Sequence, residues 1–181
     1  MAYKSDINKS ILNKNNFRLL IDKVPTVEYY VRSCNIPGVQ FSEAVQPAGL
    51  GVDAYFPGDK ASFDTLEVSF LVDEDLGNFI EMYAWMDSIV PITDTDLWAS
   101  YTSTAKNKIN VLASQENDRN QYSDVTLVIN TNKNIPNRFI RFHDAFPISL
   151  SAIELESGAD AEPAICTVLF RFTFYEIKTT S

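Results

Sequence analysis

The sequence is poor in the side chains that bind transition metals. Its 181 residues include one histidine and two cysteines, Cys34 and Cys166, which are far apart in the chain. No Cys/His set has the spacing of a zinc site, and no Asp-x-Asp-x-Asp-Gly loop has that of a calcium site. We therefore expect no metal and no cofactor. We also predict that both cysteines are buried free thiols rather than a disulfide.

Long apolar runs are also missing. No run approaches the ~20 residues that a membrane-spanning helix needs. The first sixteen residues, MAYKSDINKSILNKNN, lack the apolar core of a signal peptide. The sequence therefore predicts no membrane segment.

Positive charge is in deficit, with 15 Lys and Arg against 24 Asp and Glu and a net charge of −9. A general nucleic-acid-binding protein normally has a basic patch, so that class is not favoured. Apolar residues make up 45% of the chain, which argues against disorder throughout. The length fits one domain with a substantial core, and 12 Phe and 8 Tyr are typical of a strand-rich protein.

The motifs of common enzyme classes are absent. Asp64 and Glu67 with the run Asp73–Asp75 could form a glycosidase-like carboxylate pair, but we interpret them as a solvated strand face and a helix N-terminus. His143 is the only candidate base for a Ser/His/Asp triad, and no Gly-x-Ser-x-Gly elbow accompanies it. The Gly-Asp-Lys run at 58–60 lacks the spacing of a phosphate-binding loop. We predict no catalysis, and a hydrogen-bonding role for His143 at a strand end.

The stretch from residue 58 to 91 has the strongest periodicity in the chain. Leu66, Val68 and Phe70 alternate with polar residues, which predicts a strand with these three side chains on one face. Apolar residues then recur at helical spacing, which predicts a helix over Leu76–Val90 that stops at Pro91.

Acidic residues precede this helix. Asp73 and Asp75 stand where an N-cap belongs, and their charges suit the positive end of the helix dipole. The apolar spacing predicts that the helix packs on a sheet through Leu76, Phe79, Ile80 and Tyr83.

The other segments read mainly as strands. Val27–Cys34 alternates, and Val39–Pro57 is strand-like but interrupted by Pro and Gly at 47–51. Residues 122–142 predict a β-hairpin with a longer loop. Ile165–Ile177 predicts the longest strand, with its even-numbered residues, from Cys166 to Phe174, in the core.

We divide the chain into a polar N-terminal arm, 1–16, and a single β domain, 17–181. The fold class predicted is mainly β, an antiparallel β-sandwich or half-barrel with one flanking α-helix. Loops rich in Gly, Pro or exposed aromatic residues often make contacts between subunits. On that basis the candidate assembly contacts are Gln46, Pro47, Gly49, Leu50, Trp98 and Tyr101.

The order of several motifs resembles a known family. From residue 58 these are Gly58-Asp59-Lys60, Phe63-Asp64, an alternating strand, Asp73-Glu74-Asp75, an amphipathic helix and Trp85. A turn, Asn35-Ile36-Pro37-Gly38, precedes them, and a strand, Ala164–Ile177, closes the chain. Together they resemble the tail-tube proteins of contractile-tailed bacteriophages over most of the chain from about Phe17. The segment 93–119 has no counterpart in that pattern.

The resemblance implies a structural protein of the virion, assembled in the host cytoplasm. In that family six chains form a ring whose inner sheets join into one β-barrel, and rings stack into a tube that conducts DNA without binding it specifically. The partners implied are the protein itself, the tail sheath, and baseplate or tail-terminator proteins. An acidic lumen, consistent with the net charge of −9, would repel the phosphates of passing DNA.

Two other interpretations stay open. Within the same class, the chain could be the tube-initiating protein at the baseplate, or the tube of a related secretion or ejection machine. From another class, it could be a monomeric β-sandwich that binds a sugar or peptide through Trp98 and Tyr101. Rings or tubes in solution would support the first class, and a ligand-binding monomer would support the second.

Overall fold

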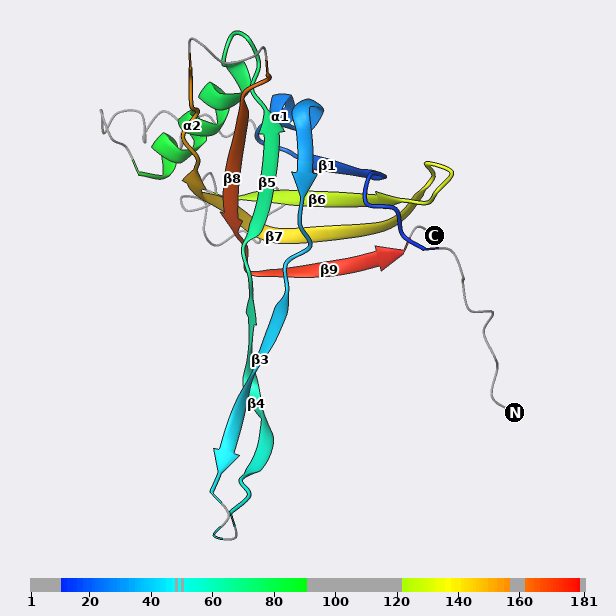
Figure 1. Ribbon diagram of the computed structural model, residues 1–181, viewed down its shortest axis with the longest axis vertical. Helices are drawn as coiled ribbons and strands as arrows, with labels where there is room; N and C mark the ends of the chain where they lie inside the picture. The colour runs from blue at the N-terminus through cyan, green and yellow to red at the C-terminus, as the bar shows by residue number, and fades with distance from the viewer. Residues whose placement is uncertain (1–10, 48, 50, 91–121, 157–161, 180–181) are drawn as a thin grey trace, which may run out of the picture.

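The computed structural model describes residues 11–47, 49, 51–90, 122–156 and 162–179 (Figure 1). Its strands are β1 (Phe17–Ile21), β2 (Val31–Cys34), β3 (Val39–Gln46), β4 (Ala54–Phe63), β5 (Leu66–Leu71), β6 (Ser123–Asn130), β7 (Pro136–Leu150), β8 (Ile165–Arg171) and β9 (Phe174–Thr179). Its helices are α1 (Pro25–Tyr30) and α2 (Gly77–Ile89). The predicted mainly β class is therefore confirmed, with two helices in the described residues rather than one.

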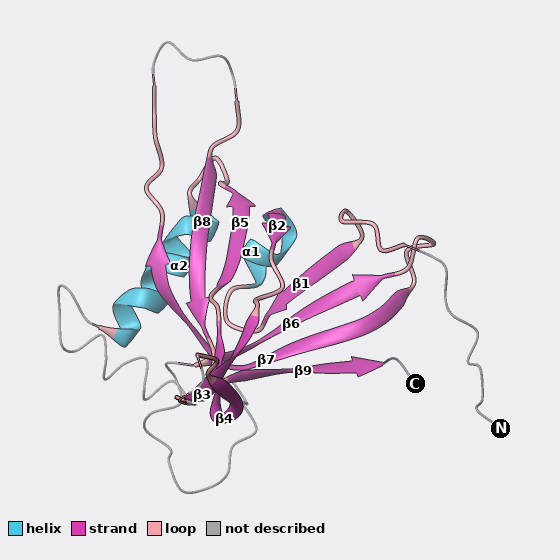
Figure 2. Ribbon diagram, turned by 60° about the horizontal axis from the view of Figure 1, so that its bottom comes forward, coloured by secondary structure: helices cyan, strands magenta, loops and turns pink. Residues whose placement is uncertain are grey.

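One long strand, β7, joins two parts of a seven-stranded antiparallel sheet. Its first half pairs with β6 and β9, and its second half pairs with β8. We call β1-β6-β7-β9 sheet A and β7-β8-β5-β2 sheet B. The strands spread like a fan from the region where β7 passes from one sheet to the other (Figure 2). The sheet stays open, as the prediction of a half-barrel requires.

The core lies between the two sheets and under α2. Leu66, Val68 and Phe70 are fully buried on one face of β5, as their alternation predicts. The neighbouring strand β8 contributes Cys166, Val168 and Phe170 to the same cluster. The predicted hairpin over 122–142 is also confirmed, because β6 and β7 pair in antiparallel register on either side of a turn.

The buried face of α2 differs from the predicted one. Leu76, Ile80 and Tyr83 are exposed, and of the predicted stripe only Phe79 packs against the core. The buried side chains are instead Asn78, Met82, Trp85 and Ser88. The helix carries apolar residues on two sides, so spacing alone permits both phases. Contacts with sheet B, such as the ring of Trp85 at 5.8 Å from that of Phe170, select the second.

The start of α2 also differs from the prediction. Leu76 occupies the N-cap position with a left-handed backbone (φ 56°), and no side chain caps the helix. Asp73 instead accepts a hydrogen bond from the backbone N–H of Glu74, its neighbour in the preceding turn. Asn78 fixes the entry to the helix, because its side-chain amide donates to the carbonyl of Leu71 at the end of β5.

The segment predicted as a strand over Val27–Cys34 begins as a helix. Residues 25–30 form α1, and only Val31–Cys34 continue as β2. Pro25 lies in the first turn of α1, where a missing N–H costs nothing. Val27 is fully buried and Tyr30 packs against the core, whereas Tyr29 is 83% exposed, so the residues of this segment contact the core at helical rather than alternating spacing.

The closing strand is two strands rather than one. β8 ends at Arg171 in sheet B, and β9 begins at Phe174 in sheet A. The chain turns through residues 172–173, so the even-numbered face does not continue into the core. Phe174 is 40% exposed and stacks on His143, on the opposite side of sheet A from the core.

Candidate assembly surfaces

A projecting hairpin is the most exposed part of the described fold. β3 and β4 form a separate two-stranded sheet that extends away from the rest of the molecule (Figure 1). It links β2 to β5 along the chain. Every residue of β3 is exposed. An isolated two-stranded hairpin is only marginally stable in water, so this hairpin is a candidate for contact with another chain.

The hairpin carries apolar side chains on both faces near its tip. Val45 pairs with Tyr55, and the adjacent pair is Ala44 with Phe56. Since neighbouring positions on a strand point to opposite faces, Tyr55 and Phe56 lie on different sides. They are 66% and 51% exposed. Two apolar faces on a thin projection are typical of a surface that becomes covered on assembly.

A close backbone approach shapes this hairpin. The β3–β4 register shifts between Phe41 and Glu43, and Ser42 lies at the bulge. A Cβ on Gly58 would lie 2.6 Å from the Ser42 carbonyl oxygen, so only glycine fits there without a backbone shift. The Ser42 hydroxyl accepts a hydrogen bond from the backbone N–H of Lys60 at 3.1 Å. The Gly-Asp-Lys run therefore has a structural role in bending the hairpin.

The candidate assembly contacts predicted from the sequence lie partly at the tip of this hairpin. Gln46 ends β3, and Pro47 and Gly49 follow it in the exposed connection to β4. Leu50, Trp98 and Tyr101 lie outside the described residues. The sequence pattern did not predict that β3 and β4 form a long projecting hairpin. It also did not single out Tyr55 and Phe56 of β4, which are exposed near the Gly/Pro-rich tip.

Sheet A offers two strand edges. β1 pairs only with β6, and β9 pairs only with β7, so within the described residues each has one edge without a neighbouring strand. The two open edges lie at opposite sides of this four-stranded unit (Figure 2). Unpaired backbone N–H and C=O groups on such edges are a template for pairing with another chain.

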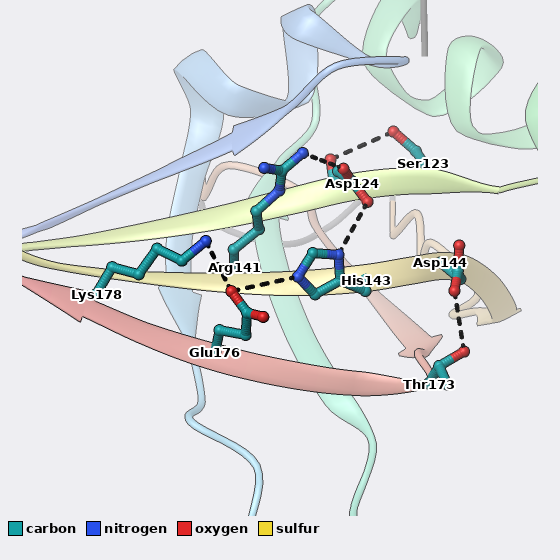
Figure 3. Close-up of polar contacts among 8 residues, drawn as sticks. All are labelled: Ser123, Asp124, Arg141, His143, Asp144, Thr173, Glu176 and Lys178. Atoms are coloured by element: carbon teal, nitrogen blue, oxygen red, sulfur yellow. Dashed lines mark hydrogen bonds and ion pairs between the residues drawn. The ribbon is translucent and has the colours of Figure 1, made fainter. Parts of the chain in front are cut away.

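The face of sheet A that points away from the core carries a cluster of charged side chains (Figure 3). Arg141 on β7 forms an ion pair with Asp124 on β6 at 2.5 Å. On β9, Lys178 forms an ion pair with Glu176 at 2.7 Å. Positive and negative groups alternate across the strands, so this face is not the uniformly acidic surface that the net charge alone suggested.

His143 lies inside this cluster rather than at a strand end, because β7 continues to Leu150. Its Nδ1 is 4.0 Å from Asp124 Oδ1, and its Nε2 is 3.8 Å from Glu176 Oε2 (Figure 3). Nε2 is buried and has no hydrogen-bond partner, so the predicted hydrogen bonding by His143 is wrong for this nitrogen. The imidazole ring instead stacks on Phe174, with the centroids 4.5 Å apart. His143 thus packs against β9 through its ring and lies within 4.0 Å of carboxylate oxygens on both β6 and β9.

Lys178 also affects the pKa of its ion-pair partner, Glu176. The hydrogen bond from Lys178, with the positive charge of the same side chain, lowers the pKa of Glu176 below its ordinary value. Glu176 is therefore a stable negative charge near the open edge of sheet A.

Two carboxylates considered in the sequence as a catalytic pair lie on the surface. Asp64 and Glu67 are exposed, as expected for a solvated surface. Among the described residues no group of three His, Cys, Asp or Glu side chains could hold a metal ion. Within the same residues, no helix has the length and apolar character needed to cross a membrane.

Both cysteines are free thiols, as predicted. Cys166 is fully buried in the core. Cys34 is partly exposed at the end of β2, but the surrounding protein still raises the pKa of its thiol to about 12 by desolvation. Cys34 is therefore not suited to nucleophilic chemistry, which needs the thiolate.

A comparison with protein families identifies the fold. The model of the family described as "Phage tail tube protein" matches residues 3–178. This chain belongs to the phage tail tube protein family. The resemblance seen in the order of its sequence motifs is therefore confirmed.

One curated protein and two solved structures are similar to this member of the tail tube family. The tail tube terminator protein of Enterobacteria phage T4 is 27% identical over 173 residues, covering 92% of this chain and 88% of the T4 protein. The tube-terminating cap of the anti-feeding prophage has a TM-score of 0.64 at 15% identity, with 99% and 100% of the two chains covered. The sheath/tube terminator of the PVC extracellular contractile injection system has a TM-score of 0.56 at 12% identity, with 95% and 99% covered. The two structures show that the fold is shared.

Proposed function

We propose that this protein forms the ring that terminates the tail tube of a contractile phage or injection system. The observation that carries the ring is the pair of open edges on sheet A, one on β1 and one on β9. A ring in which each β9 pairs with the β1 of the next copy leaves neither edge of sheet A exposed. A hexameric ring of this kind would surround a β-barrel lumen built from four strands per subunit.

The terminal position is supported by the T4 relative, a tail tube terminator similar over nearly the whole length of this chain. A terminator needs one surface for the last ring of the tube and must not recruit further copies of itself. The projecting β3–β4 hairpin, apolar on both faces, is suited to the first task, because it reaches beyond the sheet that would form the ring. We expect the tube, and the end of the sheath around it, to be the partners.

The role is structural, and catalysis is not part of the proposal. We infer that DNA passes through the ring without specific binding, because the net charge of −9 opposes the approach of phosphate. The monomeric binding module, which was based on Trp98 and Tyr101, is not retained, since the chain belongs to the phage tail tube protein family.

The second candidate is a subunit of the tube itself, and one experiment separates the two. Purified protein is examined by mass photometry and negative-stain microscopy, alone and after addition to the cognate tube protein during polymerisation. A terminator forms single rings alone and stops tube growth at substoichiometric amounts. Long tubes formed by this protein alone would favour the tube subunit, and a monomer with no effect on tube growth would contradict both.

A further inference from the structure

We propose that neighbouring copies in the ring pair β9 with β1 in one register, which places Glu176 of one copy opposite Arg18 of the next. The same register places Phe174 opposite Leu20. This inference rests on the proposed ring and adds the residues that close it. Three properties of sheet A lead to it: strand direction, the face each side chain occupies, and charge.

Strand direction permits the pairing. β1 is antiparallel to β6, β6 to β7, and β7 to β9. β9 therefore runs opposite to β1. When β1 of a second copy joins the free edge of β9, the new pair is antiparallel like every other pair in the sheet. The strand order can then repeat around a closed ring without a parallel pair or a gap.

The faces of the two strands restrict the register. Leu19 and Ile21 are buried, so Arg18 and Leu20 point to the other side of β1. On β9, Tyr175 pairs with the buried Phe142, so the residues next to Tyr175 point away from the core. A continuous sheet must keep core-facing residues on one side, so only shifts by even numbers of residues are allowed.

Charge repulsion disfavours the unshifted register, in which the cross-strand rows of one copy continue directly into the next copy. Within one copy, Arg18 lies in the same cross-strand row as Lys178, through Val128 of β6 and Phe139 of β7. If the next copy continued this row, its Arg18 would lie opposite Lys178. Like charges directly opposite each other destabilise a strand pair. Closing a sheet into a barrel also requires a stagger between strands, which an unshifted junction does not add.

A shift of two residues toward the start of β9 removes this conflict. Arg18 then lies opposite Glu176, which is an opposite-charge pair, and Leu20 lies opposite Phe174. A shift of two residues in the other direction would place Arg18 opposite Thr180, which carries no charge, so no opposite-charge pair would form. Charge therefore selects the register that is shifted toward the start of β9.

Both members of the proposed charge pair are accessible. The side chain of Arg18 is 68% exposed, and it uses Nε and Nη2 for Glu28 of α1. A guanidinium has five N–H donors, so donors remain for a second carboxylate. The Glu176 side chain is 41% exposed while bound to Lys178. The junction would thus extend the ion pairs already present on this face of sheet A.

The same register also covers apolar surface on the core side. Ile177, which is 62% exposed in the single chain, would lie opposite Phe17 of the next copy. Tyr175 would lie opposite Leu19, next to the existing core cluster. Each side of the junction then has complementary neighbours: charges on one face and apolar side chains on the other.

Charge reversal tests the pair. Arg18→Glu and Glu176→Arg should each reduce ring formation, measured by mass photometry over a range of protein concentrations, because each places like charges together. The double variant should restore rings to near the parent level. Glu28→Gln is the matched control, since it removes the ion pair of Arg18 within the chain and leaves the junction charges unchanged. Rings in the parent and both single variants, or no restoration in the double variant, would overturn the register.

Cysteine cross-linking tests the register directly. Leu20→Cys with Phe174→Cys should give disulfide-linked oligomers up to the full ring on a non-reducing gel, because directly opposite residues have the Cα separation a disulfide needs. Arg18→Cys with Lys178→Cys, the pair for the unshifted register, is the control and should not cross-link. Cross-linking of the control pair would overturn the proposal. So would rings in which neither pair cross-links, whereas the absence of parental rings would contradict the proposed function itself.

Discussion

At the scale of single residues, Lys23 is a half-buried charge near the core. Its Nζ lies 5.3 Å from the centroid of the Trp85 ring. Burial lowers the pKa of the amine from 10.5 to about 8. The unfolded chain therefore binds more protons than the folded chain between about pH 8 and 10.5. The contribution of Lys23 is unfavourable in full below pH 8 and is relieved as the pH rises through that window.

Lys23→Met should remove this dependence. We expect the variant to be more stable than the parent at pH 7 and to lose that advantage as the pH approaches 10, in urea unfolding at a series of pH values. Cys34 has the opposite effect on stability. Its thiol has a pKa of about 12 in the folded chain against 9.0 ordinarily, so the free energy of unfolding falls as the pH rises above 9. Because both proteins contain Cys34, the difference between their unfolding free energies at each pH reports the contribution of Lys23.

The exposed Lys60 of the hairpin supplies the control for this experiment. Lys60→Met removes the same charge from the net total without relieving a buried amine. Its unfolding free energy should track that of the parent at every pH. A Lys23→Met curve that also runs parallel to the parent would show that burial of this amine has no energetic consequence.

At the scale of elements, the two sides of α2 should differ sharply in their contribution to folding. Met82 is fully buried, whereas Ile80 is 56% exposed. Met82→Ala should lower the free energy of unfolding by roughly 2–5 kcal/mol, as other large-to-small core changes do. Ile80→Ala should change it by less than about 0.5 kcal/mol. Urea unfolding of both variants measures the two effects. A larger loss from Ile80→Ala than from Met82→Ala would mean that the helix has the other phase, and equal losses would contradict a difference between its two sides.

At the scale of the whole molecule, we expect the body of the fold to determine folding and the projecting hairpin to determine assembly. Tyr55→Ser with Phe56→Ser removes apolar surface from both faces of the hairpin, which contributes no buried residue to the core. Circular dichroism and the urea midpoint should remain near those of the parent. Binding to tube ends, measured as arrest of tube growth, should fall at least about tenfold, because central aromatic contacts dominate most interfaces.

Ile80→Ser is the matched control for this double variant. Ile80 is also an exposed apolar residue, but it lies on α2, at the opposite end of the molecule from the hairpin (Figure 1). Arrest of tube growth should be unchanged in this control. If the hairpin variant fails to fold, the hairpin belongs to the folding unit. If it still arrests growth like the parent, the contact with the tube lies elsewhere.

Local periodicity was enough to predict several elements of this fold. The alternation of Leu66, Val68 and Phe70 was sufficient to identify a buried strand face, because polar residues between them leave only one apolar side. The β6–β7 hairpin and the existence of a helix near 76–90 followed for the same reason. The order of these elements was specific enough to indicate the family.

Contacts between distant segments selected among the arrangements that periodicity permits. α2 has two apolar sides, and packing against Phe170 chose the one with Met82 and Trp85. The segment 165–179 has one continuous alternation, yet the chain turns between two sheets after Arg171 and puts Phe174 on the outer face. Periodicity in the sequence shows which residues can share one face of a strand or helix, whereas burial depends on which other element packs against that face. That partner comes from strands far away in the chain, and only the assembled sheets supply it.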